Sequence, residues 1–394
     1  MNEMNMEDAN ANKKNKKSGK TDFLLGNVAC AEGALYAGCG FFAAYPITPA
    51  SDIGEHFVKR VTEREGFFIQ TEDEIAAMGA VIGASWGGLK AMTATSGPGI
   101  SLMSENIGLA VATETPCVIV NVQRGGPSTG SPSLPLQADM LQARYGSQGD
   151  YELIACAPSS PQEMFDLTVW AFNAAEKYRT PVFVLSDALV GHMYEQVHLP
   201  EPGVLPVVDR KIPERYDKSV PMFLDEGVAP MSVFGRGLKS NVTGSTHFPD
   251  GTRSVGSVAA MDDEIRKLRG KLHKAIDDIT MDETYCLEDA DVVLYAYGSM
   301  FRAALAGMEL ARSRGLRVGC YRATTVWPFP ERRVRNVTAH SRAVIVCENN
   351  LGQMYYPVSA AVAENIRVLR GTPKVLGGLP RPEDFVLWVK EALR

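Results

Sequence analysis

Short apolar runs alternate with segments of helical periodicity from residue 23 onward, and this alternation constrains the fold more than any other feature. The apolar runs have the length of strands, and the segments between them are long enough for helices that cross back over a sheet. The predicted strands are 41–44, 67–70, 91–95, 117–122, 153–156 and 182–185. The predicted helices are 30–38, 50–64, 74–87, 100–113, 135–144 and 160–177. This part of the chain is therefore expected to be an α/β unit with a mainly parallel sheet.

A second, smaller α/β unit is predicted toward the end of the chain. It is expected to contain a strand at 291–297, a helix over 300–314, strands over 317–321 and 343–347, and a helix over 356–369. Between the two units the alternation fails, and a stretch of this length is usually functional or interfacial. The expected organisation is a first domain at 23–205, a long connector at 206–285 and a second domain at 286–394.

Residues 1–22 are rich in Asn and Lys and contain almost no large apolar side chains. Such a composition buries too little surface to offset the entropy of ordering, so a disordered tail is expected. The segment has no apolar core of the length of a signal peptide, and no run of about 18 apolar residues predicts a membrane span.

The charge and the cysteines exclude several function classes. The formal net charge is −6, and the basic residues are interspersed with acids, which argues against a nucleic-acid or membrane partner. The seven cysteines are widely separated and form no CxxC pair, so no metal or cluster site is predicted in this chain. Several lie in apolar runs where a free thiol acts as a small hydrophobe, and a reducing cytoplasm is expected.

Three acidic residues, Glu72, Asp73 and Glu74, follow the strand at 67–70 and precede a helix of almost only small residues. Alanines and glycines on that helix allow a neighbouring layer to approach closely, so an acid at its start is expected to enter a packed interface. Burial of a carboxylate is costly unless it has a partner. Held against a ligand nitrogen, such a group becomes a tuned acid or base.

Parallel sheets bind ligands beyond the carboxyl ends of their strands. Thr48 follows the strand at 41–44 between two prolines, which fix the backbone that carries its hydroxyl. A helix cap formed by Thr48 or Ser51 is the simpler interpretation, and a cap and a ligand contact are compatible.

Arg124 follows the strand at 117–122 and begins a loop of Gly, Pro, Ser and Thr. Its guanidinium is suited to bind a carboxylate through two parallel hydrogen bonds, although an exposed arginine paired with an acid fits the sequence equally well. Glycines that expose backbone N–H groups, together with the hydroxyls of Ser128 and Thr129, favour an anionic ligand. Thr48, Arg124, Ser128 and Thr129 are therefore the candidate substrate-binding residues.

Ser96 and Gly97 belong to the sequence TSGPG after the strand at 91–95. This sequence fits a phosphate cradle at a helix N-terminus, but it lacks the P-loop lysine and the full dinucleotide pattern, so a tight turn is the default. We take Ser96 and Gly97 as candidate cofactor-binding residues beside Glu74. The six histidines have no metal-ligand spacing, and no GxSxG sequence is present.

Taken together, these loops resemble the alpha subunit of the 2-oxoacid:ferredoxin oxidoreductases, which depend on thiamine diphosphate. The resemblance extends from Gly26 to Leu393. It rests on GNVACAEGALYAGC, AYPITPAS, TEDEIAAMGAVIGAS, MTATSGPGISLMSENIGLA, VQRGGPSTG and ARYGSQGD, on FGRG and VTG in the connector, and on ENNLGQM in the second domain. Within this family the chain is most similar to the 2-oxoglutarate-oxidising branch.

The resemblance implies a parallel-sheet, pyrimidine-type thiamine diphosphate-binding domain followed by a transketolase C-terminal-like α/β domain. In the family, the carboxylate that matches Glu74 hydrogen-bonds the aminopyrimidine ring of the cofactor. The ylid that forms at the thiazolium carbon of the cofactor then attacks the carbonyl group of a 2-oxoacid. Glu72 and Asp73 are then solvated or capping acids. Thr48 and Arg124 match positions that hold the carbonyl and carboxylate of the substrate.

The chain departs from the family pattern at three positions, and these bear on which substrate it takes. Ala50 stands where serine is common, Ser133 where threonine is common, and Gln148 where histidine is often expected. For 2-oxoglutarate a second cation must meet the distal carboxylate. Arg144 is one candidate, and the partner chain is the other source.

The resemblance also implies partners, because this chain lacks a GDG-type turn leading to Asn, which marks the diphosphate half of the site. A beta subunit is expected to bring the diphosphate site, Mg²⁺ and an iron–sulfur cluster, and a gamma-type subunit is also possible. The expected reaction is the reversible, CoA-dependent decarboxylation of 2-oxoglutarate to succinyl-CoA, with ferredoxin as electron acceptor. The alternatives are pyruvate or a branched-chain 2-oxoacid as substrate, or a non-catalytic scaffold.

Overall fold

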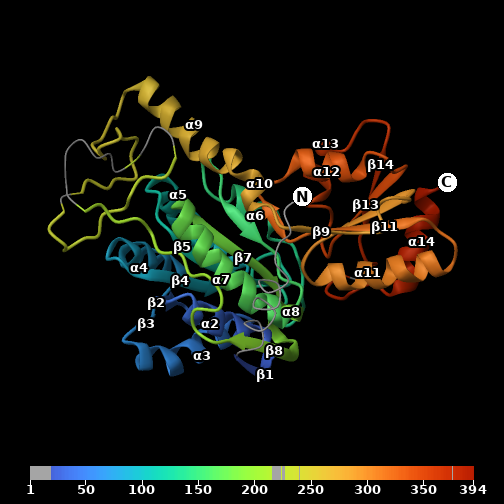
Figure 1. The fold of residues 1–394 in the computed structure, drawn as a ribbon, viewed down its shortest axis with the longest axis horizontal. Helices are drawn as coiled ribbons and strands as arrows, with labels where there is room; N and C mark the ends of the chain where they lie inside the picture. The colour runs from blue at the N-terminus through green and yellow to red at the C-terminus, as the bar shows by residue number, and fades with distance from the viewer. Residues whose placement is uncertain (1–18, 215–222, 224–226, 239, 375) are drawn as a thin grey trace, which may run out of the picture.

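The computed structural model describes residues 19–214, 223, 227–238, 240–374 and 376–394. Figure 1 shows two α/β units side by side, with helices α9 (Val258–Lys274) and α10 (Ile276–Ile279) in the segment that joins them. Residues 1–18 of the predicted disordered tail lie outside the described residues. No helix in the described ranges combines the length and the apolarity that a membrane crossing requires.

The first unit contains a seven-stranded sheet with the order β12-β6-β7-β5-β4-β2-β3. All its strands run parallel except β12 (Thr325–Trp327), which comes from the second unit and pairs antiparallel with β6. The other strands are β2 (Cys39–Ala44), β3 (Phe67–Gln70), β4 (Lys90–Thr95), β5 (Cys117–Gln123), β6 (Ile154–Cys156) and β7 (Pro181–Asp187). The six strands predicted for this unit are therefore confirmed, and the two units share one sheet.

Helices cover both faces of this sheet, because side chains alternate between its faces with a period of two. Val118 and Val120 of β5 belong to a core with α2 and α7, whereas Ile119 belongs to a core with α4 and α5. The helices of the unit are α2 (Gly26–Tyr36), α3 (Ser51–Val61), the 3₁₀ turn η1 (Thr62–Arg64), α4 (Glu74–Trp86), α5 (Pro98–Ala112), α6 (Met140–Tyr145), α7 (Pro161–Tyr178) and α8 (Ala188–His192). Burial on both faces explains the nearly continuous apolar sequence of β5.

Strand β1 (Gly19–Leu25) begins inside the segment predicted to be a disordered tail, so that prediction is wrong for residues 19–22. The strand pairs antiparallel with β8 (Tyr194–Pro200), and the ring of Phe23 stacks on Tyr194 with centroids 5.6 Å apart. Its side chains are mostly exposed. Backbone pairing with a distant strand, rather than a buried apolar face, therefore orders it.

The second unit contains a five-stranded sheet with the order β14-β13-β10-β11-β9, in which only β9 runs antiparallel. Its strands are β9 (Asp282–Tyr285), β10 (Val292–Ala296), β11 (Val318–Ala323), β13 (Ala343–Cys347) and β14 (Arg367–Gly371). Its helices are α11 (Gly298–Ser313), α12 (Glu331–Thr338), α13 (Tyr355–Ala361) and α14 (Pro382–Ala392). The predicted helix over 356–369 is wrong beyond Ala361, because the chain turns there and β14 pairs with β13.

The connector is anchored on the first unit by Arg210. Its guanidinium donates to both carboxylate oxygens of Glu176, at 2.7 and 2.6 Å, and to the carbonyl oxygen of Ser85 at 2.6 Å. Arg210 is 8% exposed and Glu176 4%. A buried ion pair with two parallel hydrogen bonds is both strong and fixed in direction, so it holds the connector in place where the connector leaves the first unit.

We expect Arg210→Ala to lower the free energy of unfolding by about 3–5 kcal/mol, because it leaves the Glu176 carboxylate buried without its cation. Urea unfolding of the full chain measures this change. The control is Arg302→Ala, which removes a partly exposed pair with Glu195 and should cost less than about 1 kcal/mol. Equal losses in the two variants would contradict the role given to Arg210.

Candidate active site

Glu74 is the first residue of α4, and the local sequence explains its place. The side chain of Asp73 caps the helix by accepting a hydrogen bond from the Ala76 amide at 2.7 Å, while Glu72 is exposed. The predicted capping and solvated roles of these two acids are thus confirmed. Glu74 itself is only 4% exposed.

The Glu74 carboxylate packs against the turn between β4 and α5. The hydroxyl of Thr95 donates to Glu74 Oε1 at 3.5 Å, and a Cβ added at Gly99 would overlap the Thr95 hydroxyl and lie 2.5 Å from Oε1. Within the described ranges Glu74 forms no ion pair. A buried carboxylate with a single weak hydrogen bond retains acceptor capacity for a ligand.

Ser96 and Gly97 continue the same turn toward Arg124. Ser96 is fully buried, and its hydroxyl has no hydrogen-bond partner among the described residues. Gly97 has a φ of 42°, and a Cβ there would lie 3.7 Å from Nε of Arg124. A Cβ at that distance would make an ordinary van der Waals contact, so the positive φ, rather than a lack of space, favours glycine in this turn.

Arg124 joins two of the predicted loops. Its Nη1 donates to the carbonyl oxygen of Thr48 at 2.6 Å, and its Nη2 donates to the carbonyl oxygen of Thr129 at 3.1 Å. Arg124 is 6% exposed, and its Nε has no partner among the described residues. The guanidinium thus holds two loops together and keeps unused N–H donors, which leaves carboxylate binding as a prediction.

Thr48, Ser128 and Thr129 have exposed side chains beside this arginine. The predicted helix cap is wrong, because α3 begins after Ala50 and no side chain of Thr48 or Ser51 caps it. Ser128 has a φ of 57°, in the left-handed region. The four predicted loops therefore meet at the carboxyl edge of the sheet, through Arg124 on one side and the Gly99 turn on the other.

Sequence reasoning missed Asn121 and Asp139, which support Arg124. The Asn121 amide donates to Asp139 Oδ2 at 3.0 Å, and the Asp139 amide donates to Gln123 Oε1 at 2.9 Å. Burial raises the pKa of Asp139, while the Asn121 hydrogen bond and the Arg124 charge act in the opposite direction. The available signal was an asparagine in the apolar strand CVIVNVQ, because a buried amide needs partners.

Arg144 does not offer a free cation. Its Nε lies 2.7 Å from Glu152 Oε1, its Nη2 donates to Oε2 at 3.2 Å, and both side chains are buried. This pairing neutralises the guanidinium inside the protein. It argues against Arg144 as the group that meets a distal substrate carboxylate.

Buried polar atoms at this edge of the sheet fit the polar part of an organic cofactor. Buried atoms without hydrogen-bond partners among the described residues include Ser96 Oγ, Asn121 Oδ1 and Arg124 Nε, all at the ends of β4 and β5. A cavity of about 230 Å³ lies at the end of β2, and its mostly apolar wall includes Tyr45, Ile47 and Phe68. Glu74, Ser96 and Arg124 do not line this cavity, so the fit to a ring with nitrogen atoms rests on the acid and the unused polar groups.

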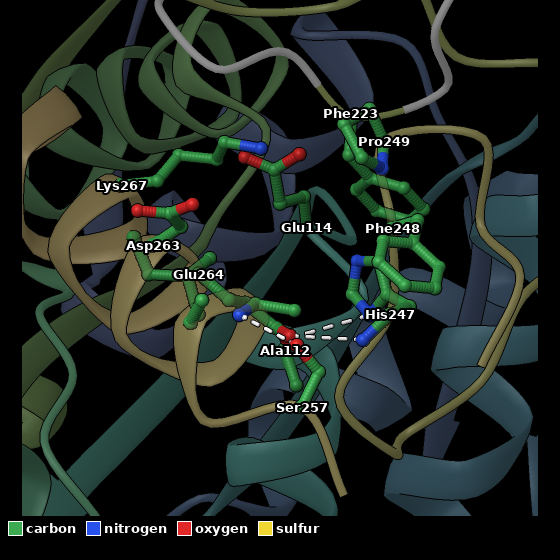
Figure 2. A pocket seen from close by; sticks show the side chains of 13 residues that line it. Ala112, Glu114, Phe223, His247, Phe248, Pro249, Ser257, Asp263, Glu264 and Lys267 are labelled. Carbon is green, nitrogen blue, oxygen red and sulfur yellow. Dashed lines mark hydrogen bonds and ion pairs between the residues drawn. The ribbon is translucent and has the colours of Figure 1, made fainter. Parts of the chain in front are cut away.

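A separate cavity of about 210 Å³ lies between α9, the end of α5 and residues 247–249. Figure 2 shows His247 facing Glu264; its amide donates to Oε2 at 3.0 Å, and its Nδ1 lies 3.4 Å from Oε1. Glu114 lines the same cavity just before β5. The cavity is therefore at the amino edge of the sheet, away from the edge where the predicted residues meet.

The comparisons with known proteins identify the family. Residues 32–267 match the model "pyruvate flavodoxin/ferredoxin oxidoreductase, thiamine diphosphate-binding", and residues 290–385 match "pyruvate:ferredoxin oxidoreductase core domain II". The chain belongs to the family of 2-oxoacid:ferredoxin oxidoreductases. The family and the α/β fold predicted from the sequence are therefore confirmed.

Relatives match over nearly the whole chain. The 2-oxoglutarate synthase subunit KorA of Methanocaldococcus jannaschii is 48% identical over 93% of this chain and 98% of its own length. The subunit of the same name from Methanothermobacter thermautotrophicus is 46% identical over 92% and 96%. The ketoisovalerate oxidoreductase subunit VorB of Methanothermobacter marburgensis is 37% identical over 94% and 97%.

Two solved structures place the fold. The 2-oxoglutarate:ferredoxin oxidoreductase of Magnetococcus marinus superposes with a TM-score of 0.89 at 33% identity, covering 95% of this chain and 66% of that chain. A split-gene transketolase superposes with a TM-score of 0.54 at 13% identity, covering 93% of this chain and 96% of that one. The second likeness shows the fold alone.

We expect Gly99→Ala to destabilise the chain by about 1–3 kcal/mol, because the added methyl group displaces Thr95 and Glu74. Thermal unfolding of the full chain measures this effect. The control is Gly270→Ala in α9, where the added Cβ has no atom within 4 Å. That substitution should be neutral or stabilising. A stable Gly99→Ala variant would show that the turn accommodates a side chain.

Proposed function

We propose that this chain is the alpha subunit of a complex that oxidatively decarboxylates 2-oxoglutarate with coenzyme A and ferredoxin, giving succinyl-CoA and CO₂. The observation that carries the proposal is the buried Glu74 carboxylate, held without an ion pair in the described residues at the edge where four loops meet. The KorA relatives support 2-oxoglutarate as substrate. The VorB relative makes a branched-chain 2-oxoacid the second candidate.

Glu74 would hold the aminopyrimidine ring of thiamine diphosphate, with Ser96 and Gly97 beside it. When bound, this cofactor supplies the carbon nucleophile and the electron sink that decarboxylation of a 2-oxoacid requires. Glu74 shares or donates a proton at a ring nitrogen, and its burial keeps water from competing for that hydrogen bond. The packing of Gly99 and Thr95 fixes the position of the acid.

Arg124 and Thr48 would hold the substrate. The unused N–H groups of Arg124 suit the carboxylate next to the reacting carbonyl, and the Thr48 hydroxyl suits the carbonyl oxygen. The exposed hydroxyls of Ser128 and Thr129 lie on the same loop. These groups would hold the substrate in an orientation in which its carbonyl carbon can react.

A partner subunit would complete the site. We propose that a beta subunit supplies the diphosphate site, Mg²⁺ and an iron–sulfur cluster, that a gamma-type subunit can join them, and that the complex works in the reducing cytoplasm. The exposed face of α4 supports this arrangement: Gly83 has open space around it, and Ile75 is 48% exposed. Small residues there let another chain approach the helix that begins at Glu74.

The substrate is tested by purifying the chain with its partner subunits and measuring CoA-dependent viologen reduction with a panel of 2-oxoacids. We expect the highest kcat/KM with 2-oxoglutarate. Higher efficiency with pyruvate or a branched-chain 2-oxoacid would overturn the substrate assignment. The absence of activity with every 2-oxoacid would overturn the enzyme assignment and favour a scaffold role.

We expect Glu74→Gln to lower kcat by about 10²- to 10⁴-fold, because the amide cannot supply the proton that the carboxyl shares with the cofactor. The complex should still assemble, as size-exclusion chromatography can verify. Glu72→Gln is the matched control, since Glu72 lies two residues earlier in the chain and is exposed. The kcat of this variant should stay close to the wild-type value. Near-normal turnover in Glu74→Gln would refute the assigned role.

We expect Arg124→Ala to raise the KM for the 2-oxoacid about 10- to 100-fold and to lower kcat/KM, because the hydrogen-bonded charge that meets the carboxylate is lost. Arg124→Lys should restore little, since a lysine cannot bridge two acceptors as a guanidinium does. Initial rates across substrate concentrations give both constants. An unchanged KM would count against carboxylate binding.

A further inference from the structure

A loop of the second unit, Asn349–Gln353, forms hydrogen bonds with residues 135–141 of the first unit, which follow the Arg124 loop (residues 125–134). We call this loop the clamp. Asn350 Nδ2 donates to the carbonyl oxygen of Gln137 at 2.7 Å, and Asn349 Nδ2 donates to that of Pro135 at 3.0 Å. The Gln137 amide donates to the Asn349 carbonyl at 3.0 Å. Gln137, Asn349 and Asn350 are each 2% exposed, so these bonds are shielded from water.

Gln353 extends the grip toward α6. Its side-chain amide donates to the carbonyl oxygen of Ala138, and its Oε1 accepts from the Leu141 amide at 3.1 Å. The clamp therefore satisfies backbone groups on both sides of Asp139, a segment that has no regular partner strand.

The clamp is itself rigidly built at the carboxyl end of β13. The Glu348 carboxylate is fully buried and accepts from the Tyr297 hydroxyl at 2.8 Å and from the Met354 amide at 2.9 Å. Asn350 Oδ1 accepts from the amides of Gly352 and Gln353 at 2.7 and 2.8 Å. Such a fully bonded turn can impose a position on what it touches.

Residues 135–141 are connected to Arg124 through the loop 125–134 and through hydrogen bonds from Asp139 to β5. Asp139 is bonded to Asn121 and Gln123 on β5, close to the Arg124 charge. The loop between is closed by the Gly125 amide, which donates to the Leu134 carbonyl at 2.8 Å. β5 therefore fixes the first end of the Arg124 loop, and the clamp fixes the second end.

We propose that the clamp positions the substrate loop, so that the second unit controls the geometry of Arg124 and Thr129 without touching the substrate. The proposal rests on the proposed function in assigning Arg124 to the substrate carboxylate. A clamp that only joined the two units would affect stability alone. A positioning clamp also affects loop order and the KM for the 2-oxoacid.

Hydrogen–deuterium exchange of the full chain tests loop order without any activity. In Gln353→Ala we expect the amides of 125–134 to exchange about fivefold faster or more, since two hydrogen bonds are lost. Arg302→Ala, which removes a cross-unit contact elsewhere, should leave this loop unchanged. If Gln353→Ala fails to fold, Asn349→Ala is used, because it keeps the backbone bonds to Gln137. Unchanged exchange in the folded variant would overturn the proposal.

Steady-state kinetics of the assembled complex test the link to Arg124. We expect Gln353→Ala to raise the KM for 2-oxoglutarate about five- to tenfold with little change in kcat. Combined with Arg124→Ala, it should raise KM no further, because the group it positions is absent. Additive effects would overturn the proposal. If the wild-type complex oxidises no 2-oxoacid, the proposed function fails, and the exchange measurement alone decides the clamp.

Discussion

Burial of the Glu74 carboxylate is the constraint on which the proposed site depends. An acid at a helix start is ordinarily a solvated group that complements the helix dipole. Here the Gly99 turn closes over it, and only a glycine leaves room for Thr95 and the carboxylate together. Asp73 takes the capping role, so Glu74 is not required for the helix itself. Under the proposed function, the carboxylate is buried so that it can hydrogen-bond the cofactor.

The same turn connects the acid to the candidate substrate-binding loops. Ser96 and Gly97 continue from the Glu74 contact to the arginine, whose guanidinium joins the carbonyls of Thr48 and Thr129. The second unit completes this chain of contacts, since it adds β12 to the first sheet and holds the segment around Gln137. The two units therefore form one framework, in which the clamp after β13 contacts the segment that follows the Arg124 loop.

The sequence predicted the elements that carry a periodic signal. Strand β13 was predicted with its observed bounds, because residues buried on both faces leave a continuous apolar run. Strand β3 was also predicted with its observed bounds from its apolar sequence, although most of its residues are exposed. Strand β1 was missed, since its order comes from pairing with β8 and not from burial. The end of the helix predicted at 356–369 was wrong for a related reason. The sequence of β14 mixes charged and apolar residues, and it forms a strand because it pairs with β13.

For the site, residue types at strand ends indicated Glu74 and Arg124, but not what each one contacts. Arg124 bonds two backbone carbonyls because the loops meet in three dimensions. The spacing of residues along the sequence does not predict such contacts. Asn121, within β5, and Asp139, just before α6, were missed because neither position indicates which partner the side chain bonds. Arg144 shows the opposite error, because its residue type suggested a free cation, whereas its guanidinium is paired with Glu152.

The most direct measurement is a high-resolution structure of the complete complex with thiamine diphosphate bound. The account predicts a Glu74 carboxylate oxygen within about 2.6–3.2 Å of a nitrogen of the aminopyrimidine ring, the range of a functional hydrogen bond. The Gly99 turn and Arg124 should keep the positions described above. A cofactor ring that contacts another acid, or lies away from the edge where β3, β4 and β5 end, would contradict the account.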